Sequence, residues 1–513
     1  MLLYGALSLG FLVLAAGLAV PIESERRELQ LNWSPARAEG LPPDIAITSA
    51  ALGTFRGLAV NFLWLRAVRL HEEGRFHEAM QLSDWITTLQ PRFPRVWEFH
   101  AWNMAYNLSS ASHDPEQRWV WVNAGIRLLR DRGIQHNPHS LGLYRELAWL
   151  YFHKIGRYHD SANLFYKTRL AEHWQEILGA PPDGSPEAYG AWLEGRLGVD
   201  SVAERVRNEE GMDPEFMLTL ARAYGPLDWR HSSSHALYWV QLGRRRSEES
   251  VRGPELFVSR EADRLVFHAL RALTHEGRIT FEPESGYFST SPDSRFVASF
   301  EKALEEVVDR GGGRDSETYR AGHRGFLEWA LRVAVSYGDR AEADRLLKRL
   351  RELYGDPARS GHPYDVGAEE FVQAALDAGL DDPVEVKQVV AGLLFRALEE
   401  GVAVDKPERA AELVATAREV YVRFGKEEVD PDTSLEQLGL RPFEEMVGDA
   451  ARQFFSDGGI PVPHRARAWS NLPPAARLQL WPRLKTSLES AARGAGLDAS
   501  VTFPPPSADG ATQ

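Results

Sequence analysis

Small and aromatic residues recur at a constant interval in the amino-terminal third of this chain. Trp97 follows Leu63 by 34 residues, and Ala101 follows Ala67 by the same 34. An interval of this length accommodates two helices and the turns that join them. A single helical hairpin leaves an apolar face uncovered, so copies must stack to bury it. The recurrence therefore predicts a solenoid of helical hairpins.

The residues between the recurring positions fit the same hairpin. In the first copy Gly74 and Phe76 form the turn, Ala79 opens the second helix, and Pro91 ends it. A further copy, with its spacing stretched by one residue in the turn, comprises Tyr144, Leu147, Ala148, Tyr151, Gly156, Tyr158 and Ala162. Small residues where helices cross allow a close approach. The predicted repeat-packing residues are Leu63, Ala67, Ala79, Ala101, Ala148 and Ala162.

This pattern resembles the tetratricopeptide repeat over residues 60–175, and looser copies occur at 216–239 and 326–353. The resemblance implies an α-solenoid whose concave surface binds other proteins. An irregular helical bundle with ordinary amphipathic periodicity is the alternative. Strand patterns are scarce, since only residues 279–281 offer a short β-like run. Both interpretations therefore predict an all-α fold.

Loops rich in proline, glycine and polar residues mark the boundaries of the predicted domains. Such loops lie at residues 179–186, 282–294, 311–314 and 356–365. The predicted organisation is a signal anchor or signal peptide at 1–21, a linker at 22–46, tetratricopeptide-like (TPR-like) repeats at 47–178, degenerate helical repeats with loops at 179–355, a carboxy-terminal helical domain at 356–502, and a disordered tail at 503–513.

The first 21 residues contain no charged side chain and are long enough to cross a bilayer. Gly17 and Ala19 suit a signal peptidase, but no lysine or arginine precedes the apolar run. A retained anchor, a cleaved signal peptide and a buried amino-terminal helix therefore remain open. We favour the anchor because the run is longer than most signal-peptide cores. It predicts a single-pass protein of the cytoplasmic membrane with the bulk of the chain in the periplasm.

Composition excludes several classes of function. The formal net charge of −14 opposes non-specific binding to nucleic acid, which requires clustered cations. The absence of cysteine excludes disulfides, thiolate metal sites, iron–sulfur clusters and cysteine nucleophiles. Arginine outnumbers lysine and alanine is abundant, which is typical of GC-rich bacterial genomes. We predict a bacterial protein without a cofactor.

Asp228, His231 and His235 form the densest group of potential metal ligands. Histidines four residues apart share one face of a helix and can bind one metal, with the aspartate close behind. The competing interpretation is a helix start at which Asp228 or one of the following serines is the N-cap. No nucleophile elbow or phosphate-binding loop occurs, so no catalytic residue is predicted.

Tryptophan is concentrated between Trp64 and Trp239, where 11 of the 15 occur. Aromatic side chains in excess of packing need can line a groove that binds a partner. The predicted partner-binding residues are Trp97, Trp102, Trp119, Trp121, Tyr144 and Tyr151. The sequence thus predicts a membrane-tethered helical-repeat scaffold that binds protein partners, such as a membrane or envelope complex, at the bacterial cell envelope. The alternatives are a metal-dependent or glycan-acting envelope enzyme and a glycan-binding module.

Overall fold

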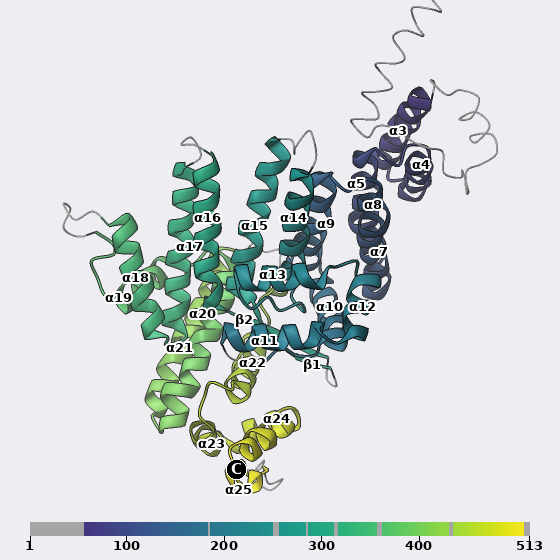
Figure 1. Ribbon diagram of the computed structural model, residues 1–513. Helices are drawn as coiled ribbons and strands as arrows, with labels where there is room; N and C mark the ends of the chain where they lie inside the picture. Colours follow the sequence, from purple (N-terminus) through teal and green to yellow (C-terminus); the bar gives the residue numbers. More distant parts are fainter. Residues whose placement is uncertain are drawn as a thin grey trace, which may run out of the picture. The chain divides into compact units, whose positions relative to one another are not determined.

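The computed structural model describes residues 56–182, 185–249, 256–283, 286–311, 316–355, 362–429 and 434–506. The predicted anchor at 1–21, the linker at 22–46 and residues 507–513 of the predicted tail lie outside the described residues. The described chain is almost entirely helical, so the predicted all-α class is confirmed (Figure 1). Among the described residues, no helix combines enough length with enough apolar character to cross a membrane.

Two compact units divide the chain. The first unit comprises the described residues within Met1–Leu150 and Trp239–Ala262, and the second comprises those within Tyr151–Tyr238 and Asp263–Gln513. Two long helices, α14 (Ser232–Glu248) and α15 (Leu256–Glu276), each contribute residues to both units.

The first unit is otherwise built from helical segments that pair as hairpins. These are α3 (Arg56–Glu72), α4 (Phe76–Leu89), α5 (Pro94–Trp102), η2 (Asn103–Leu108), α6 (Ser109–Ala111), α7 (Pro115–Arg127), η3 (Leu128–Gly133), α8 (Ile134–His136) and α9 (Leu141–Trp149). The segments η2 and η3 are π-helical and continue the α-helices on either side of them. Gly74, at a φ of 74°, makes the turn between α3 and α4, a conformation that glycine adopts without strain. The arrangement is compatible with a helical solenoid.

Small residues lie where the helices of the first unit cross. Ala67 and Ala79 are fully buried in a cluster shared by α3 and α4. On α7, a Cβ added to Gly125 would lie 2.8 Å from the carbonyl oxygen of Ala101 and 3.4 Å from Cβ of Ala105. The two helix backbones therefore approach so closely at this point that only glycine fits.

Ala148, Ala162 and Leu63, which were also predicted to pack between helices, are buried or half-buried. Ala148 is fully buried, Ala162 is buried, and Leu63 is half-buried. In the copy that begins at Tyr144 the first helix ends in the π-helical segment η4 (Leu150–Ile155), after which the Gly156 N–H donates to the Tyr151 carbonyl oxygen five residues earlier, at 3.1 Å.

The second unit contains the remaining elements. Its helices are α10 (Asn163–Leu178), α11 (Pro186–Leu197), α12 (Asp200–Asn208), α13 (Pro214–Tyr224), η5 (Ser294–Phe296), α16 (Val297–Gly311), α17 (Ser316–Ser336), α18 (Arg340–Tyr354), α19 (Ala368–Ala378), α20 (Pro383–Arg396), η6 (Ala397–Gly401), η7 (Val402–Val404), α21 (Pro407–Glu427), η8 (Leu435–Leu438), α22 (Phe443–Ser456), α23 (Val462–Asn471), α24 (Pro474–Gly494) and α25 (Ala499–Thr502). Its strands are β1 (Arg278–Glu282) and β2 (Tyr287–Ser291).

Several helices of the second unit start as their sequences predict. Pro383 and Pro407 occupy the first turns of α20 and α21. At α20 the Asp382 carboxylate accepts the Val384 N–H at 2.8 Å, and the missing N–H of proline costs nothing at this position. The loose copy at 326–353 forms a hairpin of α17 and α18 that turns at Gly338, where φ is 76°.

The two strands form an antiparallel pair in which Phe281 lies opposite Phe288. Both rings are buried against Ala171 of α10. The β-like run predicted at 279–281 is therefore β1, but the prediction of a loop throughout 282–294 was wrong. The turn at Gly286, with a φ of 64°, returns the chain so that β2 pairs with β1.

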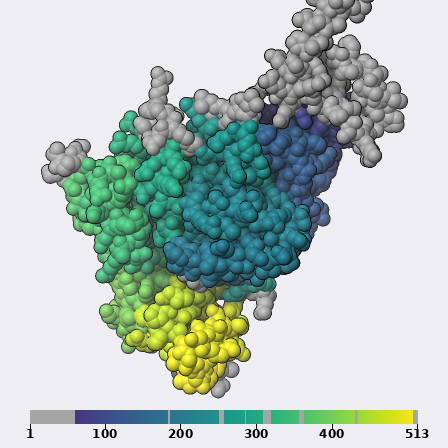
Figure 2. Space-filling model, viewed as in Figure 1, coloured from purple at the N-terminus to yellow at the C-terminus, as the bar shows by residue number. Residues whose placement is uncertain are grey.

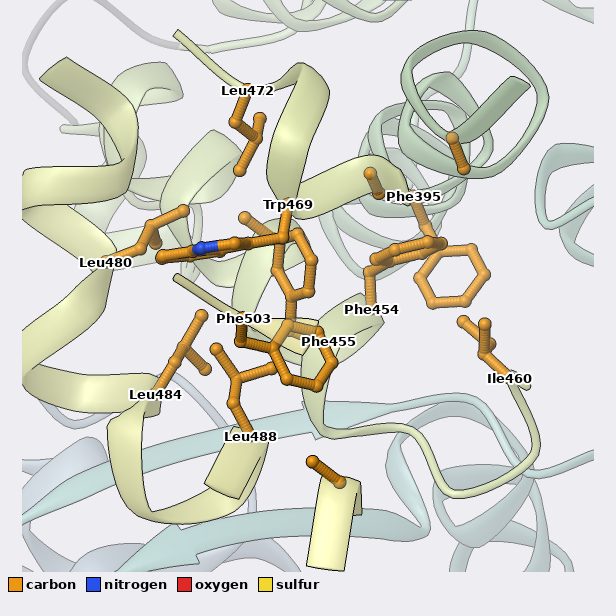
Figure 3. Packing of buried hydrophobic residues seen from close by; sticks show 14 residues of the cluster. Phe395, Phe454, Phe455, Ile460, Trp469, Leu472, Leu480, Leu484, Leu488 and Phe503 are labelled. Carbon is orange, nitrogen blue, oxygen red and sulfur yellow. The ribbon is translucent and has the colours of Figure 1, made fainter. Parts of the chain in front are cut away.

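An aromatic core fills the carboxy-terminal part of the second unit (Figure 3). The Phe455 and Trp469 rings meet edge to face, with centroids 5.6 Å apart. Phe503 is fully buried in the same cluster, and the Trp469 indole N–H donates to the Pro504 carbonyl at 3.0 Å. The carboxy-terminal helices, yellow in Figure 2, thus pack onto α22 of their own unit through a continuous apolar interior.

Candidate functional site

Three of the six predicted partner-binding aromatic residues are interior side chains. Trp97 is fully buried and its indole N–H donates to the Pro91 carbonyl at 2.8 Å. Tyr144 is also buried, and its hydroxyl donates to the Pro138 carbonyl at 3.1 Å. Tyr151 is buried and stacks on His235 with ring centroids 4.8 Å apart. These three rings hold helices together and have almost no surface to offer a partner.

The other three predicted aromatic residues reach the surface of the first unit. Trp102 is 38% exposed, and Trp119 and Trp121 are half-buried on α7. Trp102 stacks on Tyr106, one helical turn later, at 5.3 Å, and also contacts the ring of His71 on α3. Since residues two apart on a helix do not share a face, Trp119 and Trp121 point in different directions.

Trp121 adjoins this group of rings at the start of α4. Its ring lies 6.0 Å from that of His77, and the neighbouring Phe76 lies 5.6 Å from His71. We call this group the aromatic surface. It consists of His71, Phe76, His77, Trp102, Tyr106 and Trp121.

A ladder of amide hydrogen bonds holds the aromatic surface in place. The Asn103 side-chain N–H donates to the Phe76 carbonyl at 3.1 Å, and the Asn107 amide donates to the Asn103 side-chain oxygen at 2.9 Å. The Asn107 amide nitrogen also lies 3.2 Å from Nδ1 of His71. The ladder connects the end of α3, the start of α4 and η2, so the rings are presented by a rigid frame.

An acidic rim borders the aromatic surface at the α3–α4 turn. Glu72, Glu73 and Glu78 are all exposed, and Arg75 is the cation among them. The Arg75 guanidinium donates to Glu78 at 2.7 Å and lies 3.3 Å from Glu73. Arg75 is therefore shared by two carboxylates, and Arg66 also attracts Glu78, so the three carboxylates outnumber the two cations and the rim keeps a small net negative charge.

The α3 helix also exposes large apolar side chains. Phe62 and Leu65 are 65% and 70% exposed to solvent with respect to the described residues. Exposed apolar side chains of this size on a helical hairpin are typical of surfaces that contact another molecule.

The predicted metal ligands do not converge. The Asp228 carboxylate is held by Arg230 at 2.7 Å. The Nδ1 atom of His231 accepts the Ser233 N–H at 3.1 Å, and Nε2 of His235 is 2.8 Å from the Trp229 carbonyl oxygen. Because α14 begins at Ser232, His231 precedes the helix, and the stretch is a helix start. The part of the chain that the structure describes contains no group of three metal-ligating side chains.

Burial explains the electrostatics of these two histidines. It lowers the pKa of His231 and of His235 to about 4, because the interior disfavours the charged ring. His235 is enclosed by aromatic rings, with Trp174 at 4.8 Å and Trp229 at 5.8 Å. Both histidines are therefore neutral packing groups at neutral pH.

Sequence reasoning missed a polar pocket in the second unit. The pocket has a volume of about 420 Å³ and lies among α10, β2, α20, α22 and the η8 segment. Lys167, Glu276, Thr290 and Lys387 form its polar wall. Lys387 donates to the Glu276 carboxylate at 2.7 Å and to the Thr290 hydroxyl at 3.1 Å. Thr290 in turn donates to Glu276 at 3.2 Å.

The charges of this wall influence one another. Burial alone would raise the pKa of Glu276, but Lys387 and Lys167 hold it well below its usual range. Burial lowers the pKa of Lys167, an effect that Glu276 only partly offsets. The carboxylate is therefore ionised, and the Lys167 ammonium lies in a position that disfavours its own charge.

One signal in the sequence pointed to this pocket. Lysine is rare, with eight residues among the 59 that are basic. Five of the eight are exposed, whereas Lys154, Lys167 and Lys387 are buried or half-buried. In a chain that otherwise uses arginine, an inward lysine indicates a place where a compact ammonium is required.

No known protein family, curated protein or solved structure matches this chain. The fold and the sites therefore define only a class: an all-α protein with helical hairpins in its first unit and a polar pocket in its second.

Proposed function

We propose that this protein is a membrane-tethered helical-repeat scaffold that binds another protein through the aromatic surface of its first unit. The hairpins of that unit are, in this proposal, tetratricopeptide-like repeats. The 34-residue recurrence and the tight crossing at Gly125 support this assignment. The observation that carries the proposal is the stack of Trp102 on Tyr106, with the His71 ring packed against Trp102, at the surface.

The energetics of the aromatic surface favour a bound state. Each Å² of apolar surface removed from water contributes about 25 cal/mol. The Asn103 and Asn107 ladder joins η2 to the start of α4 and to the His71 ring, and Trp102 packs on His71 and Tyr106, so less side-chain entropy is lost when a partner covers these rings. Tryptophan and tyrosine are also the residues that most often dominate binding energy at protein interfaces.

The acidic rim indicates the chemistry of the partner. Glu72, Glu73 and Glu78 favour lysine or arginine side chains, and the faces of Trp102 and Tyr106 attract the same cations. We therefore propose that the partner presents a segment with both apolar and basic side chains. A neutral glycan has no cation to pair with the rim.

The apolar run at residues 1–21 supports the membrane part of the proposal. A variant that lacks these residues should leave the membrane fraction and retain its partner-binding surface. Recovery of this variant in the membrane fraction, after a wash at high salt, would contradict the tether.

Site-specific photo-crosslinking in intact cells tests the partner. A photoreactive amino acid in place of Trp121 should give one discrete protein adduct, which mass spectrometry identifies. A matched control carries the same group in place of Val501, which is 77% exposed in the second unit. Trp102→Ala should abolish the Trp121 adduct. The proposal fails if no protein adduct forms, if the adduct survives Trp102→Ala, or if the Val501 control gives the same adduct.

A further inference from the structure

The pocket of the second unit is independent of the proposed partner surface. Its volume of about 420 Å³ falls in the range of sites that hold small molecules. Besides the polar wall, it has apolar lining from Leu164, Phe288, Val384 and Met446. A cavity with a charged end and apolar sides fits a ligand that has one charged group and a short apolar body.

The inner wall of the pocket carries more positive than negative charge. Lys167 is influenced by Glu276 and also by two other cations, Lys387 and Arg157. Glu276 is already bound by Lys387 and Thr290. Lys167 makes no hydrogen bond or ion pair with the described residues, and the carboxylate that attracts it, Glu276, is already bound by Lys387, so its ammonium has no counterion of its own. A desolvated ammonium without a counterion is costly, and an anion would offset this cost.

One helix adds to the positive potential. The first turn of α10 contributes Asn163 to the pocket lining, whereas the N-terminus of α20 is already neutralised by the carboxylate of its N-cap, Asp382. Helix N-termini carry partial positive charge and favour anions near them. This contribution reinforces the unpaired Lys167, which lies on α10 itself.

The acidic residues of the pocket do not cancel this charge. Asp449 is paired with Arg441 at 3.2 Å and accepts the Tyr287 hydroxyl at 2.9 Å. Glu436 and Glu445 are exposed at the rim, where water and salt screen them. The half-buried Lys167 therefore favours an anion, and the exposed Glu436 and Glu445 disfavour a second negative charge on the ligand.

We propose that this pocket binds a small organic anion, a carboxylate or phosphate monoester with a short apolar group, whose charged end pairs with Lys167. The apolar body would lie against Leu164, Phe288 and Met446. The anion would bind beside the Lys387–Glu276 pair without replacing it.

Calorimetric titration of the purified full-length chain tests the proposal. The probes are hexanoate, hexyl phosphate, inorganic phosphate and, as the cationic control, hexylamine. We expect hexanoate or hexyl phosphate to bind at millimolar concentration or below and hexylamine not to bind. Preference between the two organic anions distinguishes a carboxylate from a phosphate ligand, and inorganic phosphate shows how much the apolar body contributes.

Two variants test whether the anion binds at Lys167. Lys167→Met keeps the side-chain length and removes the charge, and we expect it to weaken anion binding at least tenfold. Lys348→Met is the matched control, because Lys348 is 77% exposed on α18 of the same unit, and it should bind as the unchanged protein does. Thermal unfolding of both variants verifies that they fold.

Amine-reactive labelling with mass spectrometry gives a second readout that does not depend on a variant. The bound anion should protect Lys167 from modification and leave Lys348 unprotected. The proposal is overturned if neither organic anion binds, if Lys167→Met binds them equally well, or if binding leaves the labelling of Lys167 unchanged. None of these results bears on the crosslinking test of the aromatic surface.

Discussion

In the first unit, aromatic rings that are not needed for packing remain at the surface, whereas in the second unit charged side chains surround a cavity. Both units use the same device for close helix packing. Gly125 meets the Ala101 carbonyl in the first unit, and Gly392 meets the ring of Tyr337 in the second, where an added Cβ would lie 2.6 Å from Cδ2. The packing rule is therefore shared, and the difference between the units lies elsewhere.

The difference comes from how far apart in the sequence the neighbours are. In the first unit the aromatic surface is made by helices that follow one another, from His71 to Trp121. In the second unit, the pair of Glu276 and Lys387 spans 111 residues, and the strand residue Thr290 joins it. Consecutive hairpins place side chains on an outer surface, and elements from distant parts of the chain enclose space between them.

Lowering the pH should distinguish the two units most strongly, because it should destabilise the second unit more than the first. Burial lowers the pKa of His231 and His235 to about 4 and that of His275 well below its usual range, all in the second unit, whereas burial lowers the pKa of His100 to about 4 in the first. Each folded-state pKa is below the ordinary value of 6.5, so the unfolded state binds more protons. The contribution of each such histidine to the free energy of unfolding is fully present above pH 6.5. It decreases by about 3 kcal/mol as the pH falls toward and below the folded-state pKa.

The second unit should therefore open before the first as the pH falls from 7 to 4. Hydrogen exchange with mass spectrometry resolves the two units in one experiment. Earlier exchange of the first unit would contradict the predicted order of opening. His235→Phe, which keeps an aromatic ring in the cage of Trp174 and Trp229, should make the second unit less sensitive to acid.

A larger side chain at Gly125 should selectively weaken the first unit. Gly125→Leu forces its side chain into the Ala101 backbone, and we expect a loss of about 2 kcal/mol in the free energy of unfolding of that unit. Urea unfolding followed by hydrogen exchange measures it. Binding of hexanoate in the second unit should be unchanged. Equal destabilisation of both units would show that they do not unfold separately.

Removal of Lys387 should weaken the second unit. Lys387→Met leaves the Glu276 carboxylate without its closest cation, and we expect a loss of about 1.5 kcal/mol, reduced because both side chains keep some contact with solvent. The pKa of Glu276 is held well below 4.5 in the folded protein, so its contribution is present above pH 4.5 and is lost as the pH falls below that. In Lys387→Met this acid dependence should shrink. An unchanged dependence would show that Lys167 alone holds the carboxylate ionised.

The smallest effect should be stabilising. Gly190 lies inside α11, and an added Cβ would have no heavy atom within 4 Å. Gly190→Ala should therefore raise the free energy of unfolding by up to about 1 kcal/mol, because alanine loses less backbone entropy in a helix. Measured beside Gly125→Leu, it separates the effect of helix propensity from that of the close crossing. A destabilised Gly190→Ala would indicate a contact made by a part of the chain that the structure does not describe.

Local sequence patterns predicted much of the helical structure. The turns at Gly74 and Gly338 and the helix starts at Pro383 and Pro407 follow from residue preferences that act within a few positions. The same patterns failed for β2, because a strand this short gains its stability from its partner β1 and not from its own residues. Whether the hairpins are tetratricopeptide repeats stays a prediction.

The aromatic residues mark the limit of such reasoning for the candidate site. Trp97 and Trp102 are five residues apart on the same helix, and one is fully buried while the other is 38% exposed. Tyr144 occupies a repeat position and is also buried, with Gly243 of α14 packed so closely that an added Cβ would lie 2.4 Å from its Cβ. Which ring faces outward depends on which neighbour covers it, and that neighbour can come from a distant part of the chain.

The sequence by itself determined that this protein is helical, that its first hairpins cross at small residues, and that no thiol chemistry is open to it. These properties follow from composition and from spacings along one helix. Only the tertiary structure decided that Trp102 contacts His71, that Trp121 contacts His77, and that Lys167 lines a pocket beside the pair of Glu276 and Lys387. The physical reason is range: helix periodicity acts over a few residues, whereas burial and ion pairing depend on whichever segments the fold brings together.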